Sequence, residues 1–279
     1  MKITILSCGW LGLPLGKFLI EIGHAVKGAT TTQSKTEHLE NAGIEPFLLK
    51  LSPEIDCENF DELIDSELVI INIPPRVAKN GSDFHLKQIQ NLIEGIKNKN
   101  AVHSVSPSDK FPKIIFISST SVYPDNNQIA TEITVIDENS VLIKAENLLK
   151  QSFEKVTILR FGGLMGYDRF PAKYYAGKPF ANWQSGVNYL HQDDAIMAIN
   201  QIINENIWNE TFNVCSPIHP SRREIIVKNG TDLKIELPIF SEKPSNEKYK
   251  IINPEKLISQ TKFQFKYTNP LDFFYQKEN

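Results

Sequence analysis

The stretch Lys2-Ile3-Thr4-Ile5-Leu6-Ser7-Cys8-Gly9-Trp10-Leu11-Gly12-Leu13-Pro14-Leu15-Gly16 opens the chain and carries the most information about its fold. A short β-branched run leads directly into closely spaced glycines and then into an apolar segment. Glycines permit a tight turn and let the backbone approach a pyrophosphate, and the N–H groups of a following helix point at that anion. Pro14 suits a first helical turn, where its missing N–H is no loss. The stretch therefore predicts a dinucleotide-binding turn around Gly9 and Gly12.

Two simpler interpretations of this opening also exist. Ser7 stands where the pattern G-x-G-x-x-G has its first glycine, so an ordinary strand, turn and helix without a ligand fits as well. The run Ile5-Leu6-Ser7-Cys8 is similar to a lipoprotein cleavage box. A secretory signal, however, needs an apolar segment of roughly 7–15 residues after a basic start. The run before Cys8 is far shorter and follows a single lysine, so we expect no signal.

The composition is typical of a soluble globular protein, with 279 residues, 41% hydrophobic and 23% charged. No apolar run approaches the roughly 20 residues that span a bilayer, and a net charge of −3 lacks the basic excess of nucleic-acid-binding proteins. Cys8, Cys57 and Cys215 are widely spaced, and the six histidines form no ligand pair. We therefore expect reduced thiols in a cytoplasmic protein with no metal and no membrane or nucleic-acid partner.

Strand-like and helix-like segments alternate through most of the chain. The expected strands are 3–6, 24–30, 46–49, 68–73, 113–117, 156–161 and 211–214, and the expected helices are 13–22, 34–42, 61–65, 84–97, 141–153 and 193–204. This β-α-β succession predicts an α/β, Rossmann-like fold with a doubly wound parallel sheet. Residues 167–186 are irregular and aromatic, and those from about 217 are rich in Pro, Lys and Asn. We expect a dinucleotide-binding core at 1–165, completed by about 188–215. A small C-terminal substrate-facing lobe at 166–187 and 216–279 would form one compact unit with it.

Four later stretches resemble motifs of the extended short-chain dehydrogenase/reductases, in family order and spacing. They are Phe116–Pro124 (the "SS-[ST]-x-VYG" stretch), Leu159–Gly166 ("LR-x-x-x-x-x-G"), Asn188–Ala195 ("x-x-I-H-V-x-D-A") and Thr211–Val214 ("x-[YF]-N-[VI]"). Each motif is weak alone, but their ordered coincidence with the opening glycines is specific. The chain thus resembles the NAD(P)-dependent epimerases and dehydratases, in an atypical branch.

One departure from the family pattern bears on the chemistry. The family's Tyr-x-x-x-Lys pair belongs on the helix after the Ser/Thr strand, where the phenol exchanges a proton with the substrate and the Lys lowers its pKa. One alignment of this segment puts Glu138 and Leu142 at the two positions, and another puts Ser140 and Lys144 there. Neither alignment supplies a tyrosine. Hydride chemistry would then need another acid or base, or would not occur.

The glycine turn and the resemblance together imply a set of cofactor-binding residues. They are Ser7, Gly9, Trp10, Leu11, Gly12, Thr30, Thr31, Thr32, Ser34, Lys35, Asn72, Ile73, Pro74, Ser118, Phe161, Gly162 and Gly163. An NAD enzyme would carry an Asp or Glu at the end of the second strand to bind the ribose 2′-OH. This chain has hydroxyls and Lys35 there instead, which favours NADP over NAD. Ser34 could equally cap the next helix.

The resemblance also implies catalytic and substrate-binding residues. Strand register favours Thr120 as the family's catalytic Ser/Thr, whereas counting back from Tyr123 favours Ser119, and Tyr123 is the nearest phenol that could replace the missing one. These hydroxyls could also simply satisfy a turn. Arg169 and His191 are expected to contact substrate, although a solvated turn and a helix start are structural alternatives.

Two functions follow from these residues. The first is an oxidoreductase or epimerase with NADP(H) that acts on a small sugar-like substrate such as a nucleotide sugar, as a monomer or homodimer. The second is a non-catalytic NADP(H)-binding sensor or scaffold that has lost the tyrosine. The run Gly12–Gly16 also resembles hydroxyacid dehydrogenases of the phosphogluconate type, but these have a large helical second domain that the segment from Pro217 cannot supply.

Overall fold

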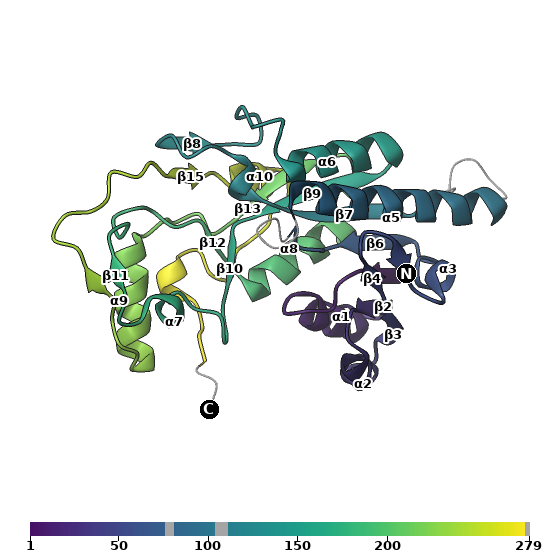
Figure 1. Cartoon of the computed structure of the whole chain (residues 1–279), viewed down its shortest axis with the longest axis horizontal. Coiled ribbons are helices and arrows are strands. Elements are labelled where there is room, and N and C mark those ends of the chain that lie inside the picture. Colours follow the sequence, from purple (N-terminus) through teal and green to yellow (C-terminus); the bar gives the residue numbers. More distant parts are fainter. Residues whose placement is uncertain (76–80, 104–110, 277–279) are drawn as a thin grey trace. The chain divides into compact units, whose positions relative to one another are not determined.

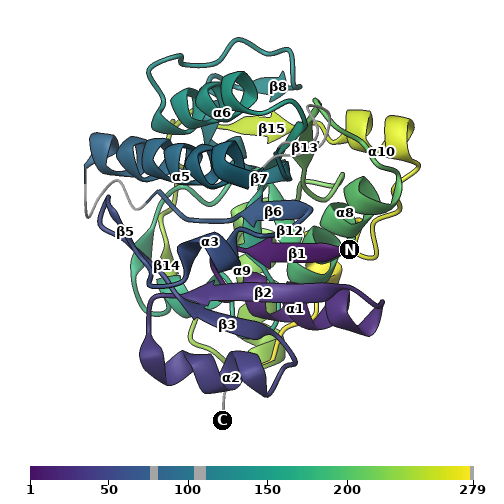
Figure 2. The same cartoon turned by 90° about the vertical axis from the view of Figure 1, so that its right-hand side faces the viewer.

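The computed structural model describes residues 1–75, 81–103 and 111–276 and centres on a seven-stranded sheet (Figure 1). The strand order is β13–β9–β7–β6–β1–β2–β3. Their bounds are β1 Lys2–Ile5, β2 Ala25–Thr30, β3 Glu45–Leu48, β6 Leu68–Ile71, β7 Lys113–Ser119, β9 Val156–Phe161 and β13 Thr211–Val214. β1 pairs in parallel with both β2 and β6, β2 with β3, and β6 with β7 (Figure 2). The chain runs outward from β1 through β2 and β3 and then returns to the other side of β1 at β6. The predicted doubly wound α/β fold is confirmed.

The strands form where the sequence is continuously apolar. All four side chains of β6 are fully buried, and every residue of β9 is buried. Burial on both faces is what helices on each side of a parallel sheet produce. The strands are therefore continuously apolar and lack the alternation of apolar and polar residues that is typical of a sheet with one exposed face.

The main helices follow the predicted segments. They are α1 Gly12–Glu21, α3 Phe60–Leu63, α5 Ser82–His103, α6 Val141–Ser152 and α8 Gln192–Asn204. On α1, Leu15 and Leu19 are one turn apart and fully buried. The helix expected at 34–42 is instead a 3-10 turn, η1 Gln33–Lys35, followed by the short α2 Thr36–Glu40. The Thr36 hydroxyl donates to the Gln33 main-chain oxygen, and such local bonds compete with helix formation.

The C-terminal third has more regular structure than its composition predicts. Its longest helix that was not predicted is α9 Arg222–Leu233, which begins with a capping box of Ser221 and Glu224. The other elements not predicted are short: β4 Lys50–Leu51, β5 Ile55–Asp56, η3 Thr120–Val122, β8 Gln128–Ala130, β10 Gly163–Met165, α7 Ala172–Tyr175, β11 Pro179–Phe180, β12 Tyr189–His191, β14 Ile239–Phe240, β15 Lys250–Ile252, α10 Glu255–Thr261 and η4 Pro270–Asp272. Their paired strands are only two or three residues long, which is too short for a pattern to predict.

The chain divides into two compact units, each built from three stretches. One contains Met1–Ser118, Asp137–Leu159 and Ile202–Thr211, and the other contains Ser119–Ile136, Arg160–Gln201 and Phe212–Asn279. This division differs from the expected boundary at residue 165, because the chain passes from one unit to the other near the ends of β7 and β9. Within the described residues, no helix is long and apolar enough to span a bilayer.

Candidate functional site

The loop between β1 and α1 is held by the strands on both sides of β1. The Cys8 N–H donates to Ala29 O of β2 at 2.8 Å. On the other side, the Asn72 Nδ2 donates to Ser7 O at 2.8 Å. Burial raises the pKa of the Cys8 thiol to about 12, so this thiol stays protonated and unreactive. The loop is therefore a fixed turn and not a mobile connection.

Gly9 and Gly12 differ in their surroundings. A Cβ built on Gly12 would lie 2.1 Å from Ser7 O, so only glycine lets α1 begin this close to the end of β1. A Cβ on Gly9 would meet no atom of the described residues within 4 Å, and Gly9 is exposed. Trp10 is half-buried and Leu11 is buried. Gly12 thus serves packing, whereas Gly9 leaves open space above the loop.

The N-cap residue of α1 is not one of the polar residues that usually cap a helix. Leu11 occupies the N-cap position without a side-chain hydrogen bond, and the first turn contains no acidic residue. The first N–H groups of a helix need partners, and the helix dipole favours an anion there. This end of α1 can therefore hold an anion.

A cavity of about 340 Å³ opens at the carboxyl ends of the strands. Its walls come from the ends of β1, β2, β3 and β6, from the β4–β5 hairpin and from α5. The lining residues are Leu6, Ser7, Thr31, Leu49, Lys50, Leu51, Ser52, Ile73, Pro74, Phe84 and Gln88. In open α/β sheets, ligands bind outside the carboxyl ends of the strands, where the strand order reverses. The cavity lies at this switch point.

Four of the predicted cofactor residues line this cavity: Ser7, Thr31, Ile73 and Pro74. The hairpin and helix walls were not predicted. Gln88 is fixed there by its Nε2, which donates to Leu51 O at 2.6 Å. The β4 and β5 strands of two residues each carry no sequence signal, so this wall could not have been found from the sequence.

The end of β2 carries hydroxyls and a lysine but no acid. Thr30 is buried, and its Oγ1 accepts from the Thr32 N–H at 3.3 Å. Thr31, Thr32, Ser34 and Lys35 are exposed. Ser34 lies inside η1, whose N-cap is Thr32, so Ser34 caps no helix. The alternative structural role considered for Ser34 is therefore wrong.

The three successive hydroxyl side chains at the end of β7, Ser118, Ser119 and Thr120, differ in their hydrogen bonds. Ser118 Oγ donates to Glu146 Oε1 of α6 at 2.6 Å, and both side chains are buried. Ser119 Oγ accepts from the Ser121 N–H at 3.1 Å and caps η3. Thr120 is buried, and its hydroxyl makes no hydrogen bond to any residue that the structure describes. Of the three, Thr120 has the hydroxyl that bonds to none of the described residues.

The Tyr123 hydroxyl is bonded inside the fold. It donates to Asn213 Oδ1 at 2.7 Å and accepts from the Arg160 guanidinium at 2.8 Å, and Tyr123 is 2% exposed. Burial raises the pKa of this phenol, although the Arg160 charge opposes that change. A phenol that is buried, protonated and bonded on both sides is a structural group. This geometry corrects the expectation that Tyr123 replaces the missing catalytic tyrosine.

His191 is likewise an internal residue. Its Nδ1 accepts from the Asp193 N–H at 3.1 Å at the start of α8, so Nε2 carries the proton and donates to Phe274 O at 3.3 Å. The ring is fully buried, and burial lowers its pKa, so it is neutral. The structural alternative fits His191 better than the expected substrate contact, because both ring nitrogens are bonded.

The remaining predicted residues follow β9. Phe161 is buried, and a Cβ on Gly162 would lie 2.4 Å from Asn188 O. The Gly163 N–H donates to the same oxygen at 2.7 Å, and Gly163 is exposed. Arg169 is half-buried and closes a turn with Gly166 through two main-chain bonds. The glycine at 162 is therefore required by packing.

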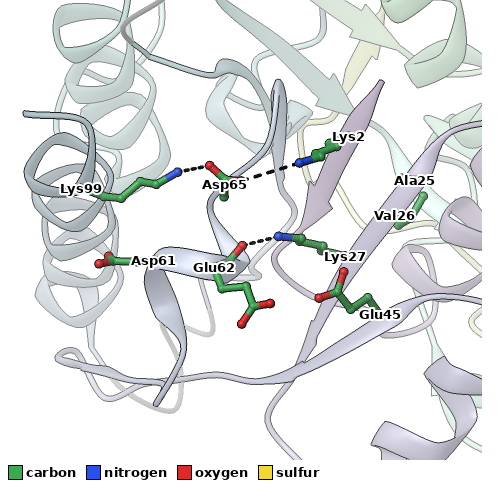
Figure 3. Close-up of a pocket in the computed structure, with 9 residues that line it drawn as sticks. All are labelled: Lys2, Ala25, Val26, Lys27, Glu45, Asp61, Glu62, Asp65 and Lys99. Carbon is green, nitrogen blue, oxygen red and sulfur yellow. Dashed lines mark hydrogen bonds and ion pairs between the residues drawn. The ribbon is translucent and has the colours of Figure 1, made fainter. Parts of the chain in front are cut away.

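A second hollow, of about 590 Å³, lies at the opposite ends of the strands (Figure 3). Lys99 and Lys2 both pair with Asp65, and Lys27 donates to the Glu62 main-chain oxygen (Figure 3). The hydrogen bond from Lys99 lowers the pKa of Asp65. This hollow is larger than the first, but it lies at the amino ends of β1, β2 and β3, away from where such sheets bind ligands. Among the described residues, no three His, Cys, Asp or Glu side chains are arranged to hold a metal ion.

Known proteins match either the whole chain or about half of it. The chain is 32% identical over 277 residues to Protein YeeZ of Escherichia coli K12, which covers 97% of both chains. About half of the chain (48%) is 28% identical over 151 residues to an epimerase family protein of Staphylococcus aureus N315, of which it covers 50%. No family model matches.

Solved structures give the fold. UDP-glucuronic acid 4-epimerase from Bacillus cereus, in complex with UDP-glucuronic acid and NAD, superposes with a TM-score of 0.75 at 17% identity, over 98% of this chain and 96% of the other. At this identity the likeness concerns the fold alone. The chain therefore belongs to the family of Protein YeeZ, and its fold is that of the NAD-dependent epimerases and dehydratases, the extended short-chain dehydrogenase/reductases.

Proposed function

We propose that this chain binds NADP(H) and acts as an oxidoreductase or epimerase on a sugar-like substrate, such as a nucleotide sugar. The observation that carries the proposal is the cavity at the switch point beside the uncapped end of α1. The epimerase relative from Staphylococcus aureus and the Bacillus cereus epimerase bound to NAD and UDP-glucuronic acid support this class of reaction.

The residues at the site fit a dinucleotide. Leu11, at the N-cap of α1, makes no side-chain cap bond, and no atom of the described residues lies within 4 Å of a Cβ built on Gly9, which leaves room for a pyrophosphate. The cavity of about 340 Å³, with apolar walls from Leu49, Leu51 and Phe84, suits the adenosine half. When bound, a nicotinamide supplies or accepts a hydride, and the protein's part is to bind and orient it.

Cofactor preference follows from the end of β2. A 2′-phosphate would meet Lys35 and the Thr31, Thr32 and Ser34 hydroxyls, all of which are exposed. A charge-assisted hydrogen bond of this kind contributes about 1.5–3 kcal/mol, or roughly 10- to 150-fold in affinity. We expect calorimetry to show tighter binding of NADP⁺ than of NAD⁺, and Lys35→Glu to remove or reverse the difference.

The matched control is Lys155→Glu, which makes the same charge change just before β9, at the amino end of that strand. It should leave the ratio of the two affinities unchanged. Tighter binding of NAD⁺ by the parent protein would overturn the assignment of NADP.

Proton transfer would fall to a residue other than a helix tyrosine, because α6 contains none. Thr120 is the best candidate, since its hydroxyl is not engaged by the described residues. A general acid or base contributes about 10²–10⁴ in rate. We expect slow turnover of nucleotide sugars, a further loss of about that size in Thr120→Ala, and recovery in Thr120→Ser.

The substitution Tyr123→Phe distinguishes a structural role of that phenol from a catalytic role. Loss of its bonds to Arg160 and Asn213 should lower the free energy of unfolding by about 1–3 kcal/mol. Tyr174→Phe, at a 51% exposed position, is the control and should change nothing. A Tyr123→Phe protein of full stability that has lost turnover would instead make Tyr123 catalytic.

A further inference from the structure

Asn72 follows β6 at the level where Ser7 follows β1. In the parallel pair β1–β6, Ile5 lies opposite Ile70, so Ser7 and Asn72 each come two residues later. The Leu6 N–H still donates to Ile70 O at 3.0 Å. Beyond that bond, the Asn72 side-chain amide donates to Ser7 O at 2.8 Å. The side chain thus continues the strand pairing at the edge of the switch point, where the ligand crevice of such a sheet opens.

The first residue of α1 packs on this hydrogen bond. The Cβ position of Gly12 lies 2.1 Å from Ser7 O and 3.0 Å from Asn72 Nδ2. Because Gly12 touches both partners, the position of Ser7 O sets where α1 begins. It thereby sets where the loop amides point.

The carbonyl end of the Asn72 amide has no hydrogen-bond partner among the described residues. Its Oδ1 is buried and accepts no hydrogen bond from any residue that the structure describes. Buried polar atoms in folded proteins are nearly always hydrogen-bonded. A donor from outside these residues is therefore expected, and the ribose hydroxyls of a dinucleotide are donors of that kind.

We propose that Asn72 is the positioning residue of the phosphate loop: it fixes Ser7 O under Gly12 and so aims the loop amides at the pyrophosphate. The inference rests on the proposed cofactor site. It predicts that a change at Asn72 weakens recognition of the pyrophosphate more than recognition of the adenosine half, which the cavity wall holds.

The test compares two ligands in Asn72→Asp. NADP⁺ carries the pyrophosphate, and 2′-AMP lacks it. A carboxylate at this position cannot donate to Ser7 O, so we expect about 10- to 100-fold weaker binding of NADP⁺. We expect less than about threefold weaker binding of 2′-AMP, measured by competition against NADPH fluorescence. Asn72→Ala, which adds no repulsion, should show the same contrast and replaces Asn72→Asp if that variant does not fold.

Asn91→Asp is the matched control. Asn91 Nδ2 donates to Pro53 O at 3.0 Å, so the same chemical change breaks an equivalent bond away from the phosphate loop. Its ratio of NADP⁺ to 2′-AMP affinity should equal that of the parent. If the Asn72 variants lose both ligands equally, or neither, Asn72 has only a structural role or none. If the parent protein binds neither ligand, both the proposed cofactor site and this inference are wrong.

Discussion

Gly9 and Gly12 lie three residues apart, yet substitution of Gly9 should affect cofactor binding, whereas substitution of Gly12 should affect stability. Gly12 packs against Ser7 O, whereas nothing in the described chain lies within 4 Å of a Cβ at Gly9. The first is a requirement of the fold. The second is open space above the loop, which the proposed cofactor would occupy.

We therefore expect Gly9→Val to abolish NADPH binding with an unchanged melting temperature, because the valine would occupy the space above the loop. Gly12→Ala should lower the free energy of unfolding by about 1–3 kcal/mol through overpacking. Thermal unfolding and NADPH fluorescence titration of both variants check this contrast. Tight NADPH binding by a folded Gly9→Val protein would show that the loop holds no pyrophosphate.

At the scale of elements, α9 and α6 begin in different ways although serine precedes both. Ser221 Oγ accepts from the Glu224 N–H at 3.2 Å, and the Glu224 carboxylate accepts from the Ser221 N–H at 2.7 Å. The Ser221 hydroxyl, which donates to Glu224 Oε2 at 2.7 Å, and the Ser221 N–H lower the pKa of Glu224. Ser140, before α6, makes no side-chain cap bond.

We expect Ser221→Ala to cost about 0.5–2 kcal/mol of stability in urea denaturation, because it removes one side of the capping box. Ser140→Ala should be neutral within error. Equal effects of the two substitutions would mean that the serine cap contributes nothing to α9.

At the scale of the whole molecule, each compact unit is assembled from stretches that are far apart in the sequence. Hydrogen bonds of buried side chains connect the stretches within a unit. Asp194, on α8, accepts from the Lys266 and Tyr267 N–H groups at 2.7 and 3.1 Å and is fully buried. Burial raises the pKa of Asp194 to about 6, although these two N–H groups act in the opposite direction. The folded state therefore binds this proton more tightly than the unfolded chain, where an Asp titrates near 3.9.

The resulting stability is fully present below about pH 4 and is lost as the pH rises through about 6. We expect the free energy of unfolding of the parent, relative to Asp194→Asn, to fall by up to about 3 kcal/mol between pH 4 and pH 7. Urea denaturation of both proteins at several pH values measures this difference. A difference that does not change with pH would show that Asp194 does not titrate in this range.

Most of the sheet and its helices could be predicted from the sequence, because apolar runs and glycines act within a few residues. The strand at 211–214 has the predicted bounds, and the glycine turn leads into α1 as expected. The α9 helix was missed because its capping box lies in a polar segment without a clear apolar face. Part of the cavity was foreseen from Ser7, Thr31, Ile73 and Pro74, which stand at strand ends.

The sequence by itself determined the order of the main strands and helices, the place of the glycine turn before α1 and the absence of a tyrosine from α6. Only the tertiary structure decided what the buried polar groups do. Tyr123 bonds to Asn213, 90 residues away, His191 to Phe274, 83 residues away, and Ser118 to Glu146. A motif identifies a polar side chain, but its hydrogen-bond partner depends on long-range packing. A buried polar group must form hydrogen bonds, and its partners are the residues that the tertiary structure places next to it.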